Sequence, residues 1–101
     1  MATRTLPETE RETAGREDLA PLYHVIFLDD PFTTMAFVVR ILVQLFQKDL
    51  QTATRLMLEV HYTGSAIVAT LPLEIAELKQ AQVHAAARAE GFPFRCRVER
   101  A

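Results

Sequence analysis

Cysteine is nearly absent from this sequence, which contains only one, Cys96. A single cysteine rules out a disulfide within the chain, and without a second thiolate there is no thiolate zinc site. Glycine is also scarce, with three residues, and the sequence has no glycine-rich loop of the kind that cradles phosphates. We therefore expect Cys96 to be a small apolar core residue.

An excess of positive charge and a long hydrophobic run are also missing. The formal net charge is −2, whereas a nucleic-acid partner usually requires a basic stripe. No apolar run approaches the roughly 18 residues of a membrane span, and the N-terminus lacks the apolar core of a secretory signal. With 50% hydrophobic and 24% charged residues, the 101-residue chain predicts one cytoplasmic domain that binds neither nucleic acid nor membrane.

The first part of the chain, residues 1–20, is rich in charge. It carries eight charged residues and no aromatic residue, and it shows neither a helical nor a strand period. Such a segment buries too little apolar surface to offset its chain entropy. We predict a flexible N-terminal extension over 1–20 and a folded core domain over 21–101.

Periodicity divides the rest of the chain into alternating elements. Aromatic and β-branched residues predict a strand over 22–28, and a helical period follows over 35–47. Asp49 is a candidate N-cap for a second helix, and Gly64 is placed to end it. The remaining elements are a strand over 66–70, a helix over 72–89 and a strand over 94–99. The order strand-helix-helix-strand-helix-strand predicts a small α+β domain, with three helices packed on a three-stranded antiparallel sheet.

Two adjacent carboxylates, Asp29 and Asp30, lie between the first strand and the first helix. Aspartates at such a junction serve either as turn residues or as the polar half of a binding site. In the second helix Met57, Val60 and His61 are spaced so that they share a face. The residue types alone leave both interpretations open, because the first two also fit a plain core and the histidine fits a helix end.

Three stretches carry a resemblance to a known family. VIFLDDPFTTMAFVV, ATRLMLEVHYTGSAIV and LEIAELKQAQVHAAA together resemble the ClpS family, whose members are adaptors of Clp ATP-dependent proteases. The similarity extends from Tyr23 to Ala101 without gaps, and LMLEVHYTG is its most specific part. It implies an adaptor that binds proteins with a large hydrophobic first residue (Leu, Phe, Tyr or Trp), called an N-degron, and delivers them to an AAA+ unfoldase.

The resemblance also implies roles for individual residues. The substrate α-amino group would be bound by Asp29, Asp30 and His61. The surface for the N-terminal domain of a ClpA-like or ClpC-like unfoldase would include Glu74 and Lys79. The hydrophobic pocket for the first side chain would be formed by Thr33, Met35, Val38, Met57, Val60 and Phe94.

Elementary chemistry is consistent with these roles. A free α-amino group has a pKa of about 7.7–8.0, so at neutral pH it is mostly a cation that needs convergent hydrogen-bond acceptors. Two carboxylates and a neutral imidazole supply such acceptors, and an apolar pocket beside them gains free energy by burying the first side chain. Three positions depart from the residues usual in the family: Asp29 replaces an asparagine, Pro31 an acid and Phe94 a leucine.

Two alternatives arise from the same residues. Asp29, Asp30 and His61 could hold a divalent metal in an enzyme, but this is a thin ligand set, and no nucleophile–base pair accompanies it. A structural interaction domain without N-terminal-residue recognition would have the same topology, as in the C-terminal domain of the ribosomal stalk protein. We expect a non-enzymatic adaptor with no metal or other cofactor.

Overall fold

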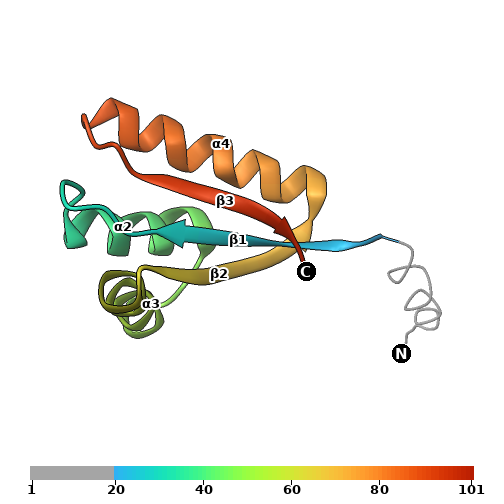
Figure 1. Cartoon of the computed structure of the whole chain (residues 1–101), viewed down its shortest axis with the longest axis horizontal. Helices are drawn as coiled ribbons and strands as arrows, with labels where there is room; N and C mark the ends of the chain where they lie inside the picture. The colour runs from blue at the N-terminus through green and yellow to red at the C-terminus, as the bar shows by residue number, and fades with distance from the viewer. Residues whose placement is uncertain (1–19) are drawn as a thin grey trace.

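The computed structural model describes residues 20–101, which form three strands and three helices (Figure 1). In chain order they are β1 (Leu22–Leu28), α2 (Met35–Phe46), α3 (Leu50–Thr63), β2 (Ser65–Pro72), α4 (Leu73–Ala89) and β3 (Arg95–Arg100). The predicted element order and α+β class are confirmed. The predicted flexible extension over 1–20 lies, apart from Ala20, outside the described residues.

The sheet has β1 at its centre, between β2 and β3, and both neighbours are antiparallel to it. Phe27 pairs with Ala66 and with Cys96, and all three residues are buried because they point to the same face of the sheet. The preceding residue, Ile26, pairs with Ile67 and points to the opposite face. The loop that follows β1 therefore starts at the middle of one end of the sheet.

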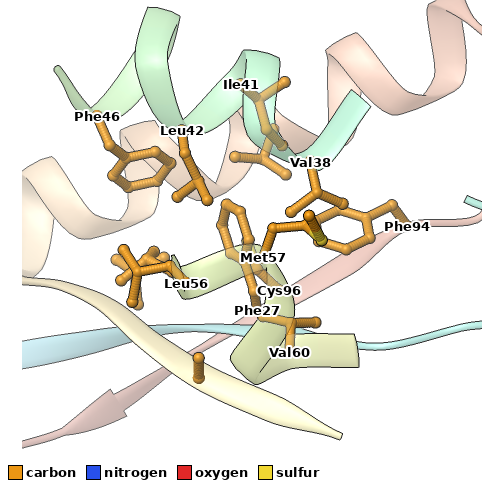
Figure 2. Packing of buried hydrophobic residues seen from close by; sticks show 14 of the residues in the cluster. Phe27, Val38, Ile41, Leu42, Phe46, Leu56, Met57, Val60, Phe94 and Cys96 are labelled. Carbon is orange, nitrogen blue, oxygen red and sulfur yellow. The ribbon is translucent and has the colours of Figure 1, made fainter. Parts of the chain in front are cut away.

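The core lies between one face of the sheet and the three helices. Its centre is aromatic, because the Phe27 ring makes edge-to-face contacts with Phe46 and Phe94, with ring centroids 5.5 and 5.0 Å apart. Figure 2 shows these rings among aliphatic side chains of α2 and α3. The apolar contacts thus connect the end of α2, the central strand and the segment before β3.

Local sequence explains where the helices begin and end. The hydroxyl of Thr34 accepts a hydrogen bond of 3.2 Å from the Phe37 N–H and caps α2. Asp49 caps α3 in the same way, by accepting from the Thr52 N–H at 3.4 Å. Helix α3 ends at Gly64, whose φ of +96° is a left-handed conformation that glycine adopts without strain. The predicted roles of Asp49 and Gly64 are confirmed.

The bounds of some elements differ from the predicted ones. Helix α2 ends one residue earlier than expected, because Gln47 adopts a left-handed φ of +53°. Strand β2 spans Ser65–Pro72 rather than 66–70, since its pairing with β1 continues to the end, and Pro72 precedes α4 instead of lying in its first turn. Strand β3 begins one residue later than predicted, at Arg95.

Within residues 20–101, no helix is both long and apolar enough to cross a membrane.

Candidate functional site

The loop between β1 and α2 is fixed both to a neighbouring turn and to itself. The Asp29 N–H donates a hydrogen bond of 3.0 Å to the carbonyl of Gly64, in the turn between α3 and β2. The Asp30 carboxylate accepts hydrogen bonds from the Phe32 N–H at 2.8 Å, the Thr33 N–H at 2.8 Å and the Thr33 hydroxyl at 2.7 Å. Asp30 is therefore the turn residue that shapes the loop.

The last turn of α3 brings His61 to this loop. Its Nδ1 atom lies 3.9 Å from Oδ1 of Asp29, which is too long for a direct hydrogen bond. The two side chains are 42% and 37% exposed. A third polar group arriving from solvent can therefore reach both of them, so the structure brings the predicted polar residues together.

Four of the six residues predicted to form a pocket lie in the hydrophobic core. Val38, Met57, Val60 and Phe94 belong to one buried cluster, and none is more than 8% exposed. Figure 2 shows all four within this cluster. The Phe94 ring contacts two other aromatic rings, those of Phe27 in β1 and Phe37 in α2. The structure therefore brings the four together as packed side chains.

The other two residues of the predicted pocket lie at the edge of the cluster. Thr33 is part of the loop and is bonded to Asp30. Met35 is the first residue of α2 and is 44% exposed, so it is not an ordinary core residue. Met35 follows the loop directly, and it lines a groove together with Met57 of the apolar cluster.

That groove, between the outer side of α2 and α3, was not predicted from the sequence. It has a volume of about 470 Å³ and a mainly apolar lining. The lining residues are Met35, Ala36, Val39, Arg40, Val43, Gln44, Leu50 and Met57. A signal was present, because the α2 sequence MAFVVRILVQLF is hydrophobic on nearly all sides, whereas a helix with one buried face has a polar outer side.

The two residues predicted to contact an unfoldase differ in their surroundings. Glu74 lies exposed in the first turn of α4. Lys79 is partly buried, and its ammonium group donates a hydrogen bond of 2.6 Å to the carbonyl of Leu45 near the end of α2. The lysine therefore joins two helices, whereas the carboxylate lies exposed at the surface of the described part of the chain.

Burial changes the chemistry of two side chains where α4 packs against β3. The pKa of His84 is lowered because the ring is partly buried and because Arg95 is close, and its Nε2 accepts a hydrogen bond of 3.1 Å from the Cys96 N–H. Burial also raises the pKa of the Cys96 thiol to about 11. Cys96 is thus a buried core residue, as predicted.

In the stretch 20–101, no group of three or more His, Cys, Asp or Glu side chains is placed to hold a metal ion. What the stretch does contain is an acidic loop, a histidine at a helix end and an apolar groove, on a small α+β scaffold. Polar groups converging beside an apolar concavity are typical of ligand sites. Fold and site together define a small α+β binding domain.

Comparison with known sequences identifies the family. The family model described as ATP-dependent Clp protease adaptor protein ClpS matches residues 18–97. The protein of that name from Nitratidesulfovibrio vulgaris is 47% identical over 81 residues, covering 80% of this chain and 78% of the relative. The corresponding protein from Oleidesulfovibrio alaskensis is 39% identical over 101 residues, covering 90% of this chain and 97% of the relative. The chain belongs to the ClpS family of adaptors for ATP-dependent Clp proteases, as the resemblance had indicated.

A solved structure supports the same assignment. The structure of Agrobacterium tumefaciens ClpS2 bound to L-phenylalaninamide matches this chain with a TM-score of 0.79 and 32% sequence identity. The match covers 81% of this chain and 99% of the other. Because nearly the whole of that protein is included, the core over β1 to β3 has the fold of a ClpS adaptor.

Proposed function

We propose that this adaptor binds proteins whose first residue is large and hydrophobic and delivers them to a Clp AAA+ unfoldase for degradation. Leu, Phe, Tyr and Trp are the first residues that it would accept. The observation that carries the proposal is the approach of His61 to Asp29 at 3.9 Å, one helical turn after Met57, which lines a groove together with the exposed Met35. Polar acceptors and an apolar entrance are then adjacent, as the first residue of a polypeptide requires.

The polar half fits a protonated α-amino group. An ammonium group has three donors, and charge-assisted hydrogen bonds to it contribute roughly 1.5–3 kcal/mol each. Asp29 and His61 each offer an acceptor to such a group. A carboxylate has about four acceptor positions, so the loop bonds to Asp30 leave capacity for a further donor. Three acceptors for three donors account for the whole charged group.

The apolar half fits the first side chain. We place that side chain against Met35 and above the cluster of Val38, Met57, Val60 and Phe94, with Thr33 at the rim. Because the cluster is packed, an entering side chain must displace some of its contacts. Met57 is best suited to move, since methionine is unbranched and adapts its rotamers. Burying a leucine or phenylalanine side chain gains roughly 1.5–3 kcal/mol.

The ligand of the Agrobacterium relative supports a site with a polar half for the amino group and an apolar half for the first side chain. L-phenylalaninamide, to which that protein is bound, has a free amino group, an aromatic side chain and an amide in place of the carboxylate. It therefore has the chemistry of the first residue of a polypeptide, and a relative that binds it supports the same substrate class here.

Delivery requires a second surface, which we place at the start of α4. Glu74 is exposed there, and large apolar side chains surround it, since Leu73, Ile75 and Leu78 are also exposed. A carboxylate among apolar groups suits a protein interface in which one charge sets the orientation. We propose that this patch contacts the N-terminal domain of the unfoldase, and that Lys79 contributes through its methylene chain.

A peptide pair tests the proposed recognition. A peptide that begins with Phe should bind at least about a hundredfold more tightly than its N-acetylated twin, because acetylation removes the charge and leaves desolvated acceptors. Titration calorimetry with both peptides measures the ratio. The Asp29→Ala variant should lose most of the affinity for the free peptide and change little toward the acetylated one. Equal binding of the two peptides by the unmodified protein would refute the proposed function.

A further inference from the structure

The groove between α2 and α3 has a mainly apolar lining that extends along α2 beyond the proposed first-residue pocket. We propose that it binds the second to fourth residues of the substrate polypeptide and that it favours apolar side chains at those positions. This inference depends on the proposed recognition of a free N-terminus. It predicts that the adaptor also selects substrates by the residues that follow their first residue.

Large aliphatic side chains of the groove lining are exposed. Val43 is 38% exposed and Leu50 is 68% exposed, although both are large aliphatic residues. They lie in the same groove as the exposed Met35. Large apolar side chains that are exposed next to one another, around a concavity, mark a surface that another molecule covers.

The groove is continuous with the proposed first-residue pocket. Met35 and Met57 line the groove and also belong to the first-residue pocket. Met35 is the first residue of α2, directly after the loop that Asp30 shapes. A polypeptide held by its amino group between Asp29 and His61 therefore begins at one end of the groove. Its next residues need only follow α2 to cover the exposed apolar surface.

The length of the groove fits a short extended segment. Along α2 it reaches from Met35 to Gln44, which at about 1.5 Å per residue is roughly 13 Å. An extended chain advances about 3.3 Å per residue. The groove therefore has room for three to four residues, which are the second to fourth of a substrate whose first residue occupies the pocket.

Charge explains why the preference is apolar. Arg40 is the ionisable residue among the lining residues, and its guanidinium group is bonded to Glu90 on the α4 side. The same group also lies 5.4 Å from the centre of the Phe37 ring. Among the described lining residues, the groove therefore offers an acidic side chain only a cation that is already shared with Glu90, and it offers a basic side chain no carboxylate. Gln44 supplies the remaining polar group of the lining.

Two Leu-first peptides of equal length test the inference, one with serine and one with leucine at positions 2–4, each followed by the same soluble tail. Competition against a labelled Phe-first peptide gives both affinities. The leucine-containing peptide should bind about tenfold or more tightly, because several half-buried apolar contacts are added. Val43→Ser and Leu50→Ser should each lower this ratio at least about threefold. Neither should change the affinity of the serine-containing peptide.

A matched control is available on α3. Leu58 is 39% exposed, close to the value for Val43, and it does not line the groove. Leu58→Ser should leave both peptide affinities unchanged. If this variant lowered the ratio as strongly as Val43→Ser, the effect would be a general loss of surface hydrophobicity and the inference would fail.

The remaining outcomes separate this inference from the proposed function. A ratio near one, with free-amine peptides still preferred over acetylated ones, would overturn the groove assignment and leave the proposed function standing. Loss of that amine preference would overturn both. A second copy of this chain could occupy the groove instead of a substrate, and analytical ultracentrifugation of the protein measures whether it forms a dimer. A dimer that Val43→Ser dissociates, with no change in the peptide ratio, would make the groove a self-association surface and refute the inference.

Discussion

The ammonium group of Lys79 on α4 donates a hydrogen bond of 2.6 Å to the main-chain carbonyl of Leu45, in the last turn of α2. It also lies 5.9 Å from the centre of the Phe46 ring. The carbonyl groups of a last helical turn lack partners within their own helix, and a cation also interacts favourably with that end of the helix dipole. Lys79 is therefore part of the structure that fixes α2 against α4.

Lys79→Met should lower the free energy of unfolding by about 1–3 kcal/mol, because a partly buried carbonyl loses a charged donor while most of the side-chain volume remains. Urea unfolding measures the change. Glu74→Gln is the control, and its exposed side chain predicts a change within about 0.5 kcal/mol. Equal unfolding midpoints for Lys79→Met and the unmodified protein would contradict the structural role of Lys79.

Asp30 and Asp29 should respond differently to truncation. Asp30→Ala removes a carboxylate that holds three hydrogen-bond donors of its own loop, so it should lower both thermal stability and affinity for Phe-first peptides. The Asp29 side chain makes only the long approach to His61 among the described residues. Asp29→Ala should therefore lower affinity by tenfold or more with little change in melting temperature. A large drop in melting temperature for this second variant would contradict the assignment.

Met35 should control access for side chains branched at the β-carbon. Its side chain stands at the start of α2 beside the proposed pocket, and forcing an extra methyl group against it costs roughly 1–3 kcal/mol. Leu-first peptides should therefore bind about five- to a hundredfold more tightly than Ile-first ones. Met35→Ala should reduce that ratio. Because Met35 is 44% exposed, the variant should lose far less stability than the roughly 2–5 kcal/mol typical of a core methionine.

The buried thiol gives a prediction about pH. The pKa of Cys96 is raised from 9.0 to about 11 by burial, and the charge of Arg95 opposes this only in part. Between those two values the unfolded chain loses its thiol proton while the folded chain keeps it, so stability should fall as pH rises through this window. Cys96→Ala should show a shallower fall in urea unfolding. An identical slope for both proteins would contradict the raised pKa.

Reactivity provides a second measurement on the same residue. The thiolate is the reactive form, and it is both rare and inaccessible in the folded protein. At pH 8 a disulfide reagent should modify Cys96 slowly in buffer and rapidly in concentrated urea. Fast modification of the native protein would indicate that the thiol is not buried.

Much of the fold could be predicted from the sequence, because helix caps, turn glycines and strand alternation are each set by neighbouring residues in the chain. Asp49 and Gly64 act within their own turns, and the alternation of the last strand reflects one buried face. The extent of β2 was underestimated because its last pairs depend on the partner strand β1 rather than on local propensity. The hydrogen bond from Lys79 to Leu45 could not be predicted from local sequence, because it joins residues of two helices that are 34 positions apart.

In the candidate site, too, some features follow from local sequence and others depend on contacts between elements of the folded chain. The two aspartates could be recognised from their position between a strand and a helix, but their separate roles depend on hydrogen bonds that form only in the folded loop. The groove was missed because helical periodicity assigns apolar residues to one inner face. Val43 lies on the outer side of α2, where its exposure depends on how α3 crosses that helix.

The hydrogen bond from the Asp29 N–H to the Gly64 carbonyl uses main-chain atoms alone. Any residue other than proline can provide that donor, so the start of the loop keeps its position when its side chains are exchanged. Positions 31 and 32 are therefore suitable for randomisation in a display library, with Asp29, Asp30 and Gly64 retained as the fixed frame. Selection from such a library would yield reagents that distinguish polypeptides by their first residue, as N-terminal sequencing chemistries require.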